Sequence, residues 1–191
     1  MAEIKVFDFD NTIYKGESSI DFALFMMRSN KRVILYLPSI FWNLLRYKLC
    51  IVDREKLQAA ITDAVKFIVR DKEEVLRLAD SFWKKNGRKL DKRMLDSISA
   101  DDVIVTASPS FLISAAGNRL KTKNIIGSVL DLDKKEVAYL NFGENKVKKY
   151  RELYGTESIG CFYTDSFNDK KMMDISDRVF LVKNGKLRRI K

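Results

Sequence analysis

Histidine is absent from the sequence, and cysteine and proline occur only twice each among its 191 residues. Without histidine, the chain can build neither a Ser-His-Asp triad nor a histidine general base or a histidine-ligated metal centre. The two cysteines, Cys50 and Cys161, lack the spacing of a zinc site or a disulfide framework, so a reducing, cytoplasmic location is expected. Any catalysis must therefore use carboxylates, hydroxyls, lysines and backbone amides.

Linkers, repeats and a signal peptide are also missing from the pattern. Two prolines and eight glycines leave little room for flexible linkers, and no internal repeat occurs. From Met1 the chain runs directly into a strand-like apolar segment, without the basic and apolar regions of a signal peptide. The length and a hydrophobic content of 46% are typical of one globular core with a modest insertion.

Positive charge is in excess, with 36 Lys and Arg against 26 Asp and Glu, which gives a formal net charge of +10. Such a charge suits an anionic partner, such as a phosphorylated small molecule or an acidic membrane surface. Basic residues that only solvate helix faces explain much of the excess equally well. No nucleic-acid-binding motif accompanies them, so no nucleic acid partner is expected.

Hydrophobic periodicity divides the chain into a helical block and an alternating block. After a first strand at Ile4–Phe9, helical spacing of apolar residues predicts four consecutive helices. These helices cover Ser18–Arg28, Val33–Leu49, Asp53–Val69, with Asp53 as its N-cap, and Asp71–Leu90. From Val103 onward, short apolar strands alternate with helices, a pattern typical of a parallel sheet with right-handed crossovers. The predicted strands are 103–106, 125–130, 136–142, 159–164 and 179–182.

Acidic residues follow two of the predicted strands. Asp8 and Asp10 flank Phe9 at the end of the first strand, and Asp165 and Asp169 follow the strand at 159–164. Ligands bind at the carboxyl ends of parallel strands, and neighbouring carboxylates are tolerated there when a cation binds. The first pair alone is equally consistent with the alternation of a half-exposed strand, but the second cluster favours a metal site. Oxygen ligands without histidine or cysteine indicate Mg2+.

Two weaker signals complete the pattern. Thr106-Ala107-Ser108 ends a strand, where hydroxyls and backbone amides can hold phosphate oxygens, although Thr and Ser end many strands. Lys146 begins a predicted helix, where it is either a phosphate ligand or an ordinary solvated lysine. Lys148 and Lys149 compete with it for the same role.

These four elements, in this order, resemble the motifs of the haloacid dehalogenase (HAD) superfamily of phosphohydrolases. The motifs are Asp8-Phe9-Asp10-Asn11-Thr12, the strand ending in Thr106, Lys146, and the cluster from Asp165 to Asp169. The resemblance covers nearly the whole chain. It implies an α/β fold with a Rossmann-like parallel sheet core, formed by residues 1–15 and 97–191, and an inserted four-helix cap, formed by residues 16–96.

The resemblance also implies roles for the motif residues. Asp8 would be the nucleophile that forms an aspartyl-phosphate, and Asp10 the general acid and base. Magnesium would be bound by Asp8, by the backbone carbonyl of Asp10 and by Asp165, with Asp169 as a further ligand or an orienting acid. The residues that would contact the transferred phosphate are Thr106, Ala107, Lys146 and Asn168.

A helical insertion between the first and second motifs resembles the phosphoserine-phosphatase-like branch of the superfamily. Glu17 stands where phosphoserine phosphatases carry an acid that contacts the substrate, but it fits equally well as the N-cap of the helix that begins near Ser18. Phosphoserine phosphatases typically carry Ser-Gly-Gly where this chain has Thr106-Ala107-Ser108. We therefore expect a phosphomonoesterase with a small soluble substrate, with phosphoserine as an alternative.

The segment 33–49 is unusually apolar and is bracketed by basic residues. A membrane-spanning helix is not expected there because Pro38, Asn43 and Arg46 interrupt the run, and Pro38 should kink the helix or start a new one. The segment is then the core of the cap, a dimer interface or a peripheral contact with an anionic membrane. In the last case the segment would resemble the apolar, basic-flanked cap segments of HAD phosphatases that act on lipid head groups such as phosphatidylglycerophosphate.

Two further classes of function stay open. One is a non-catalytic phosphate-binding module on the same fold, which would need no pairing of a nucleophile with an acid. The other is a purely structural basic protein, which would neither bind magnesium nor turn over a substrate. The chain is expected to be a monomer or a homodimer.

Overall fold

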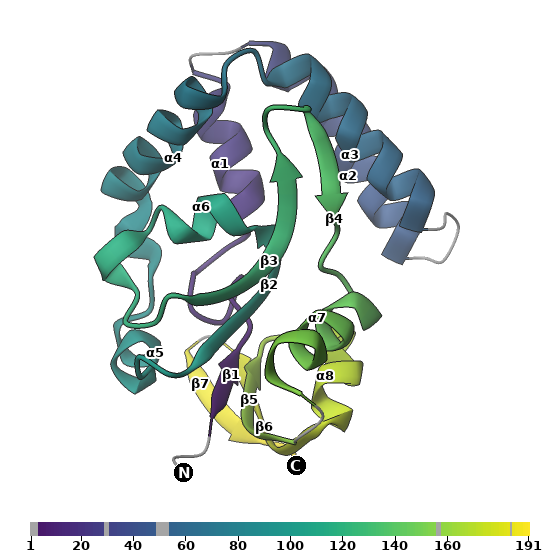
Figure 1. Cartoon of the computed structure of the whole chain (residues 1–191). Helices are drawn as coiled ribbons and strands as arrows, with labels where there is room; N and C mark the ends of the chain where they lie inside the picture. Colours follow the sequence, from purple (N-terminus) through teal and green to yellow (C-terminus); the bar gives the residue numbers. More distant parts are fainter. Residues whose placement is uncertain (1–3, 29–30, 49–53, 156–157, 184) are drawn as a thin grey trace.

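The computed structural model of the chain describes residues 4–28, 31–48, 54–155, 158–183 and 185–191. Leu49, Cys50 and Asp53, which entered the sequence predictions, lie outside these residues. Within them, seven strands form one sheet in the order β4-β3-β2-β1-β5-β6-β7 (Figure 1). The mixed α/β fold with a mostly parallel sheet confirms the predicted fold class.

The five central strands of the sheet all run parallel to one another. They are β1 (Lys5–Phe7), β2 (Val103–Pro109), β3 (Asn124–Asp131), β5 (Ile159–Thr164) and β6 (Ser176–Lys183). The chain crosses from one side of β1 to the other between β4 and β5, so β1 lies between β2 and β5. A change of direction of this kind opens a crevice at the carboxyl ends of the strands.

The strand at each edge of the sheet is antiparallel to its neighbour. The sheet is therefore mixed and not purely parallel. On one side β4 (Glu136–Tyr139) pairs with β3, and on the other β7 (Lys186–Arg189) pairs with β6. The sequence predicts no strand at β7, because its exposed, mostly basic residues carry no apolar alternation. Charged side chains on an edge strand block pairing with a further strand.

The helical insertion between β1 and β2 holds the four predicted helices and one more. They are α1 (Ser18–Met26), α2 (Arg32–Lys48), α3 (Arg54–Ile68), α4 (Lys72–Asn86) and, after the 3₁₀ turn η1 (Gly87–Lys89), α5 (Lys92–Ser97). Helix α2 continues through Pro38, so no new helix begins there. The short α5 escapes prediction because its six residues give too little periodicity.

The remaining helices lie between the strands of the second half. They are α6 (Ser110–Ser114), α7 (Glu144–Tyr154) and α8 (Lys170–Asp174), with 3₁₀ turns η2 (Gly117–Arg119) and η3 (Phe167–Asp169). Helices α7 and α8 cover one face of the sheet, where Tyr150 and Met172 pack on Val6 and Phe162 (Figure 1).

The other face of the sheet shares its hydrophobic core with the helical insertion. Phe9 and Tyr14, which follow β1, pack with Phe82 and Trp83 of α4, and all four side chains are fully buried. The indole N–H of Trp83 donates to the carbonyl of Leu112 in α6 over 2.6 Å. Helix α4 is therefore fixed to the sheet layer by burial and by a buried hydrogen bond.

Helices α2 and α3 lie beside β4, away from the centre of the sheet (Figure 1). Leu57 of α3 is fully buried against Val137 and Leu140, which form a second, smaller contact between the insertion and the sheet. The side chain of Gln58 donates to the carbonyl of Val137 over 2.9 Å. The antiparallel hairpin of β3 and β4 thus supports the outer part of the helical insertion.

Candidate active site

Asp8 and Asp10 lie where β1 ends, between the carboxyl ends of β2 and β5. The backbone N–H of Asp8 continues the pairing with β5 by donating to the carbonyl of Tyr163 over 2.8 Å, which fixes the backbone at this position. Asn11 then adopts the left-handed region with φ 57°, which Asn tolerates better than most residues, and the chain turns away from the sheet.

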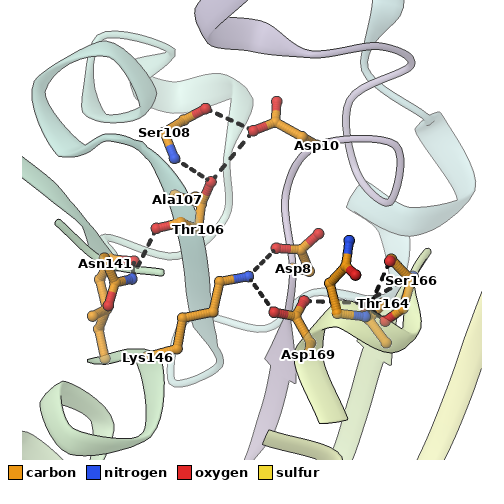
Figure 2. A network of polar contacts seen from close by, with 12 residues as sticks. Asp8, Asp10, Thr106, Ala107, Ser108, Asn141, Lys146, Thr164, Ser166 and Asp169 are labelled. Atoms are coloured by element: carbon orange, nitrogen blue, oxygen red, sulfur yellow. Dashed lines mark hydrogen bonds and ion pairs between the residues drawn. The ribbon is translucent and has the colours of Figure 1, made fainter. Parts of the chain in front are cut away.

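Lys146 joins two of the predicted site carboxylates. Its ammonium group lies 2.8 Å from Oδ1 of Asp8 and 2.8 Å from Oδ1 of Asp169, and all three side chains are buried (Figure 2). The competing lysines lie elsewhere on α7, since Lys148 is exposed and Lys149 pairs with Glu152 at 2.7 Å. Lys146 is therefore the lysine of this helix that reaches the carboxylate cluster.

Burial and mutual repulsion set the electrostatics of the site. Burial raises the pKa of Asp8, and Asp169 and Asp10 add to the rise while Lys146 opposes it. Burial likewise raises the pKa of Asp165, with Asp169 as the next cause. For Lys146, burial disfavours the charged form, but attraction by Asp8 and Asp169 outweighs it, so its pKa is raised. Negative groups outnumber the single ammonium, which makes the site suitable for a further cation.

Metal binding by side chains alone is a separate question. Among the residues that the structure describes, no three His, Cys, Asp or Glu side chains are grouped so that they could hold a metal ion. The ligand set implied by the motifs combines the carboxylates of Asp8 and Asp165 with the backbone carbonyl of Asp10, so it does not require three side chains. The donor atoms are all oxygens, which is the chemistry that Mg2+ prefers.

Asp10 is held by donors from two different parts of the chain. Its Oδ1 accepts the backbone N–H of Ser18, in the first turn of α1, over 2.6 Å. Its Oδ2 accepts the hydroxyl of Ser108 over 2.6 Å, and the hydroxyl of Thr106 lies 3.5 Å from the same oxygen (Figure 2). Ser108 is not among the predicted site residues, although the Thr-Ala-Ser spacing places both hydroxyls on one side of the strand end.

The pairing of β2 with β3 is irregular at Thr106–Ser108. The register between the two strands shifts between Val105 and Pro109, and side chains from neighbouring segments bond to the carbonyls of this stretch. Asn141 donates to the carbonyl of Thr106 over 2.8 Å, and Ser128 donates to the carbonyl of Ala107 over 2.6 Å. These two supports have no sequence signal, because each depends on a contact made by the folded chain.

Asp169 is oriented by its own loop. Oδ2 of Asp169 accepts the hydroxyl of Thr164 over 3.1 Å, while Oδ1 faces Lys146. Asn168, which directly precedes Asp169, is exposed on η3, where its backbone N–H donates to the hydroxyl of Ser166 over 3.1 Å. The structure therefore groups Asp169 with Lys146 and leaves the side chain of Asn168 facing solvent.

Glu17 occupies the N-cap position of α1, but its side chain makes no capping hydrogen bond. Its carboxylate accepts the side-chain amide of Asn11 over 2.9 Å instead, and the residue is exposed. The first turn of α1 receives its side-chain acceptor from Asp10, through the N–H of Ser18. Capping by Glu17 is therefore not observed, and a contact with substrate stays a prediction.

A mostly parallel sheet with carboxylates and a buried lysine at the carboxyl ends of its strands is typical of one class of hydrolases that form an aspartyl intermediate. The chain belongs to one family of this class, because the model of the haloacid dehalogenase-like hydrolase family matches residues 6–174. This match extends from β1 to the end of α8 and includes every candidate site residue. A search of curated proteins gave no match.

Several solved structures share the fold. A protein of unknown function from Bordetella pertussis Tohama I has a TM-score of 0.75 at 17% identity, covering 94% of this chain and 89% of that one. A phosphoserine phosphohydrolase-like protein from Francisella tularensis subsp. tularensis SCHU S4 has 0.60 at 14%, covering 96% and 88%. An apo phosphoserine phosphatase has 0.55 at 13%, covering 94% and 85%. Family membership and these phosphatase folds support a phosphoric monoester hydrolase.

Proposed function

We propose that the chain is a magnesium-dependent phosphatase that hydrolyses a phosphomonoester through an aspartyl-phosphate on Asp8. The observation that carries the proposal is that two carboxylates, two residues apart, have different contacts. Asp8 is buried against the ammonium of Lys146, whereas Asp10 is held by a hydroxyl and a backbone N–H. Two carboxylates in different surroundings suit different roles, one as nucleophile and one as acid and base. A non-catalytic binding module has no use for such a division.

The proposed reaction proceeds in two steps. An oxygen of Asp8 forms a bond to phosphorus while the ester oxygen leaves, and Asp10 gives that oxygen a proton. Asp10 then removes a proton from water, the water oxygen attacks phosphorus, and the bond to Asp8 breaks to release phosphate. Lys146, Thr106 and the backbone at Ala107 offer donors to the phosphoryl oxygens, whose charge must be stabilised in both steps.

Magnesium would offset the repulsion between the carboxylate of Asp8 and a phosphate dianion. Asp8, the backbone carbonyl of Asp10 and Asp165 would hold the ion. Asp169 would act mainly by orienting, which is supported by its contacts with Lys146 and Thr164 rather than with other acids. Asn168 would have to turn toward the phosphate from its exposed position, so we rank it below Thr106 as a phosphate ligand.

We further propose that residues 16–96 act as a cap over a core formed by residues 1–15 and 97–191. All five helices from α1 to α5 lie between β1 and β2, as such an insertion requires. Helices α1, α3 and α4 contribute buried side chains to the cluster that also contains β1 and β2. Rearrangement of the cap on substrate binding would therefore be small for α4, which contributes Val75, Ala79, Phe82 and Trp83 to this cluster.

The proposed activity is tested by hydrolysis of p-nitrophenyl phosphate with and without magnesium, followed by a panel of phosphorylated metabolites that includes phosphoserine. We expect turnover that requires magnesium, and a loss of at least about 1000-fold in Asp8→Asn, which removes the nucleophile. Asp133→Asn is the matched control, since Asp133 is an exposed acid that pairs with Lys72 far along the chain. Full activity in Asp8→Asn would contradict the assigned nucleophile.

A lipid head-group phosphate is the second candidate substrate, and one specific observation favours it. Helix α2 exposes Ile34, Leu35 and Trp42, here called the α2 stripe, with exposed fractions of 47%, 69% and 58%. Leu35 and Trp42 are two turns apart and so lie on the same side of the helix. Exposed Lys31 precedes the stripe, and cations beside exposed apolar and aromatic residues suit an anionic membrane surface.

The proposed membrane contact is peripheral. Among the described residues, no helix is long and apolar enough to cross a bilayer. Flotation with vesicles of phosphatidylglycerol at low salt tests the contact, with phosphatidylcholine vesicles as the uncharged control. We expect binding to the anionic vesicles that is weakened in Trp42→Ser. A protein that stays at the bottom of the gradient at low salt would leave the small soluble substrate as the proposal.

A further inference from the structure

Ser108 makes the shorter of the two side-chain contacts to Asp10, yet neither the motifs nor the proposed reaction gives it a role. Its hydroxyl lies 2.6 Å from Oδ2 of Asp10, whereas the hydroxyl of Thr106 lies 3.5 Å from the same oxygen. Ser108 is 3% exposed, so water hardly competes for this contact. A buried hydrogen bond to a carboxylate is among the stronger ones in proteins.

The hydroxyl of Ser108 is also the acceptor for two serines of the helical insertion. Ser18 donates to it over 3.0 Å, and the hydroxyl of Ser19 lies 2.6 Å away. A serine hydroxyl has one hydrogen and two lone pairs. Because the hydrogen of Ser108 is directed to Asp10, both α1 hydroxyls must donate, and a directed chain of hydrogen bonds runs from α1 through Ser108 to the carboxylate.

The position of Ser108 is set by the fold and not by Asp10. Its backbone N–H donates to the hydroxyl of Thr106 over 3.0 Å within the bulge. On the other side, a Cβ at Gly127 would lie 2.7 Å from the carbonyl oxygen of Ser108, so only glycine allows β3 to approach this closely. The hydroxyl is therefore presented to Asp10 by a rigid strand end.

We propose that Ser108 is a positioning residue, which holds the carboxylate of Asp10 in the orientation for proton transfer and connects it to the first helix of the insertion. The inference rests on the proposed function, in which Asp10 moves the protons. Oδ1 is fixed by the N–H of Ser18 and Oδ2 by Ser108, so the two contacts together prevent rotation of the carboxylate. Without the hydroxyl of Ser108, Oδ2 keeps only the long contact with Thr106.

The test compares two aryl phosphates that differ in how much they need a proton from Asp10. Phenyl phosphate releases a phenol with a pKa of about 10, similar to a tyrosine side chain, and p-nitrophenyl phosphate releases a more acidic phenol. Since kcat/KM reports the step in which the leaving group departs, Ser108→Ala should lower it by about 10- to 100-fold for phenyl phosphate. The loss should be several times smaller for p-nitrophenyl phosphate.

The controls separate positioning from folding. Ser158→Ala removes an exposed serine hydroxyl that pairs with Asp177 before the start of β5, so both substrates should keep kcat/KM within about twofold. Ser108→Thr keeps the hydroxyl and should recover most of the kcat/KM that Ser108→Ala loses for phenyl phosphate. If Ser108→Ala does not fold, Ser108→Cys, which keeps the size but is a weaker donor, should show a smaller change in the same direction.

Two results would overturn the inference while leaving the proposed function intact. One is an active wild-type protein whose Ser108→Ala variant keeps kcat/KM for both substrates. The other is an equal loss for both substrates, which indicates a general structural defect. A wild-type protein that hydrolyses neither substrate with magnesium present would instead contradict the proposed function itself.

Discussion

Lys146 differs from the other lysines of α7 in what its ammonium group contacts. Lys146→Met removes the cation between Asp8 and Asp169. In the proposed reaction it would also leave the phosphoryl oxygens without their charged donor. We expect kcat/KM for p-nitrophenyl phosphate to fall by about 100- to 1000-fold, as for the loss of other transition-state donors. Lys148→Met changes an exposed lysine two residues away and should leave kcat/KM unchanged. Equal losses in the two variants would refute the assignment.

Single residues also show where sequence reasoning reaches its limit. The shared position of Asp8, Asp165, Thr106 and Lys146 could be predicted, because each lies at a strand end or a helix start. The topology of a parallel sheet brings such ends together. Ser108 could have been found from its spacing to Thr106. Asn141 and Ser128 could not, because their partners lie 35 and 21 residues away in the chain and are chosen by the bulge.

At the scale of elements, α4 is expected to depend on Trp83. The side chain is fully buried between the insertion and the sheet, and it donates a hydrogen bond to α6. Trp83→Ala should lower the free energy of unfolding by roughly 3–5 kcal/mol, because it leaves a cavity and an unpaired carbonyl. Urea denaturation measures the change, and Trp42→Ala, at an exposed position, should stay within about 0.5 kcal/mol of the wild type.

Helix α5 offers a test of stability against pH. Its N-cap Asp91 accepts the N–H of Arg93 over 3.0 Å and pairs with Lys15 at 3.4 Å. Burial opposes ionisation of Asp91, but hydrogen bonds from the N–H groups of Arg93 and Met94, together with Lys15, outweigh it and lower its pKa. The folded protein therefore binds this proton less readily than the unfolded chain does.

The sign of the effect follows from that lowered pKa. The stabilisation by Asp91 is fully present above the ordinary aspartate pKa of about 4, and it is lost as the pH falls through the lower pKa of the folded state. Asp91→Ala should cost about 1 kcal/mol at pH 7, as for other N-caps. Asp91→Asn keeps a capping oxygen, so the gap in unfolding free energy between wild type and Asp91→Asn should narrow between pH 6 and pH 3. A gap that widens on acidification would contradict this assignment.

How well each helix or strand could be predicted depends on its length and on its hydrophobic pattern. The long helices α1 to α4 carry enough apolar repeats to be recognised, and the central strands carry continuous apolar runs. The six-residue α5 and the basic strand β7 carry neither signal. The sequence pattern also does not predict that β4 is antiparallel. Its direction depends on the hairpin with β3 and on packing against Leu57 of α3.

At the scale of the whole molecule, the excess of carboxylates in the crevice predicts a gain of stability on metal binding. Removal of divalent ions with a chelator should abolish hydrolysis, and magnesium should restore it. Because an ion that binds only the folded state stabilises it by mass action, the melting temperature should rise with magnesium concentration. The rise should be much smaller in Asp165→Asn than in Asp174→Asn, which changes an exposed acid of α8. Equal shifts in the two variants would exclude Asp165 as a ligand.

The helical insertion and the sheet share one hydrophobic cluster, which the sequence alone does not predict. Periodicity predicts four helices between residues 18 and 90, but it cannot show that Phe82 and Trp83 pack against Phe9 and Tyr14 rather than against another helix. The shared cluster arises only when β1 and α4 meet in the folded chain. The oligomeric state, whether monomer or homodimer, and the cytoplasmic location stay predictions.

The burial of Trp83 should make its fluorescence distinguishable from that of the other tryptophan. The sequence contains two tryptophans, and one is fully buried while the other, Trp42, is 58% exposed. An aqueous quencher such as acrylamide should therefore quench the fluorescence of Trp42 first. The remaining emission should come mainly from Trp83 and report on the contact between α4 and the sheet. If the α2 stripe binds to vesicles, the fluorescence emission of Trp42 should shift to shorter wavelengths, while the emission of Trp83 should stay constant. Docking and unfolding can thus be followed in one unlabelled sample.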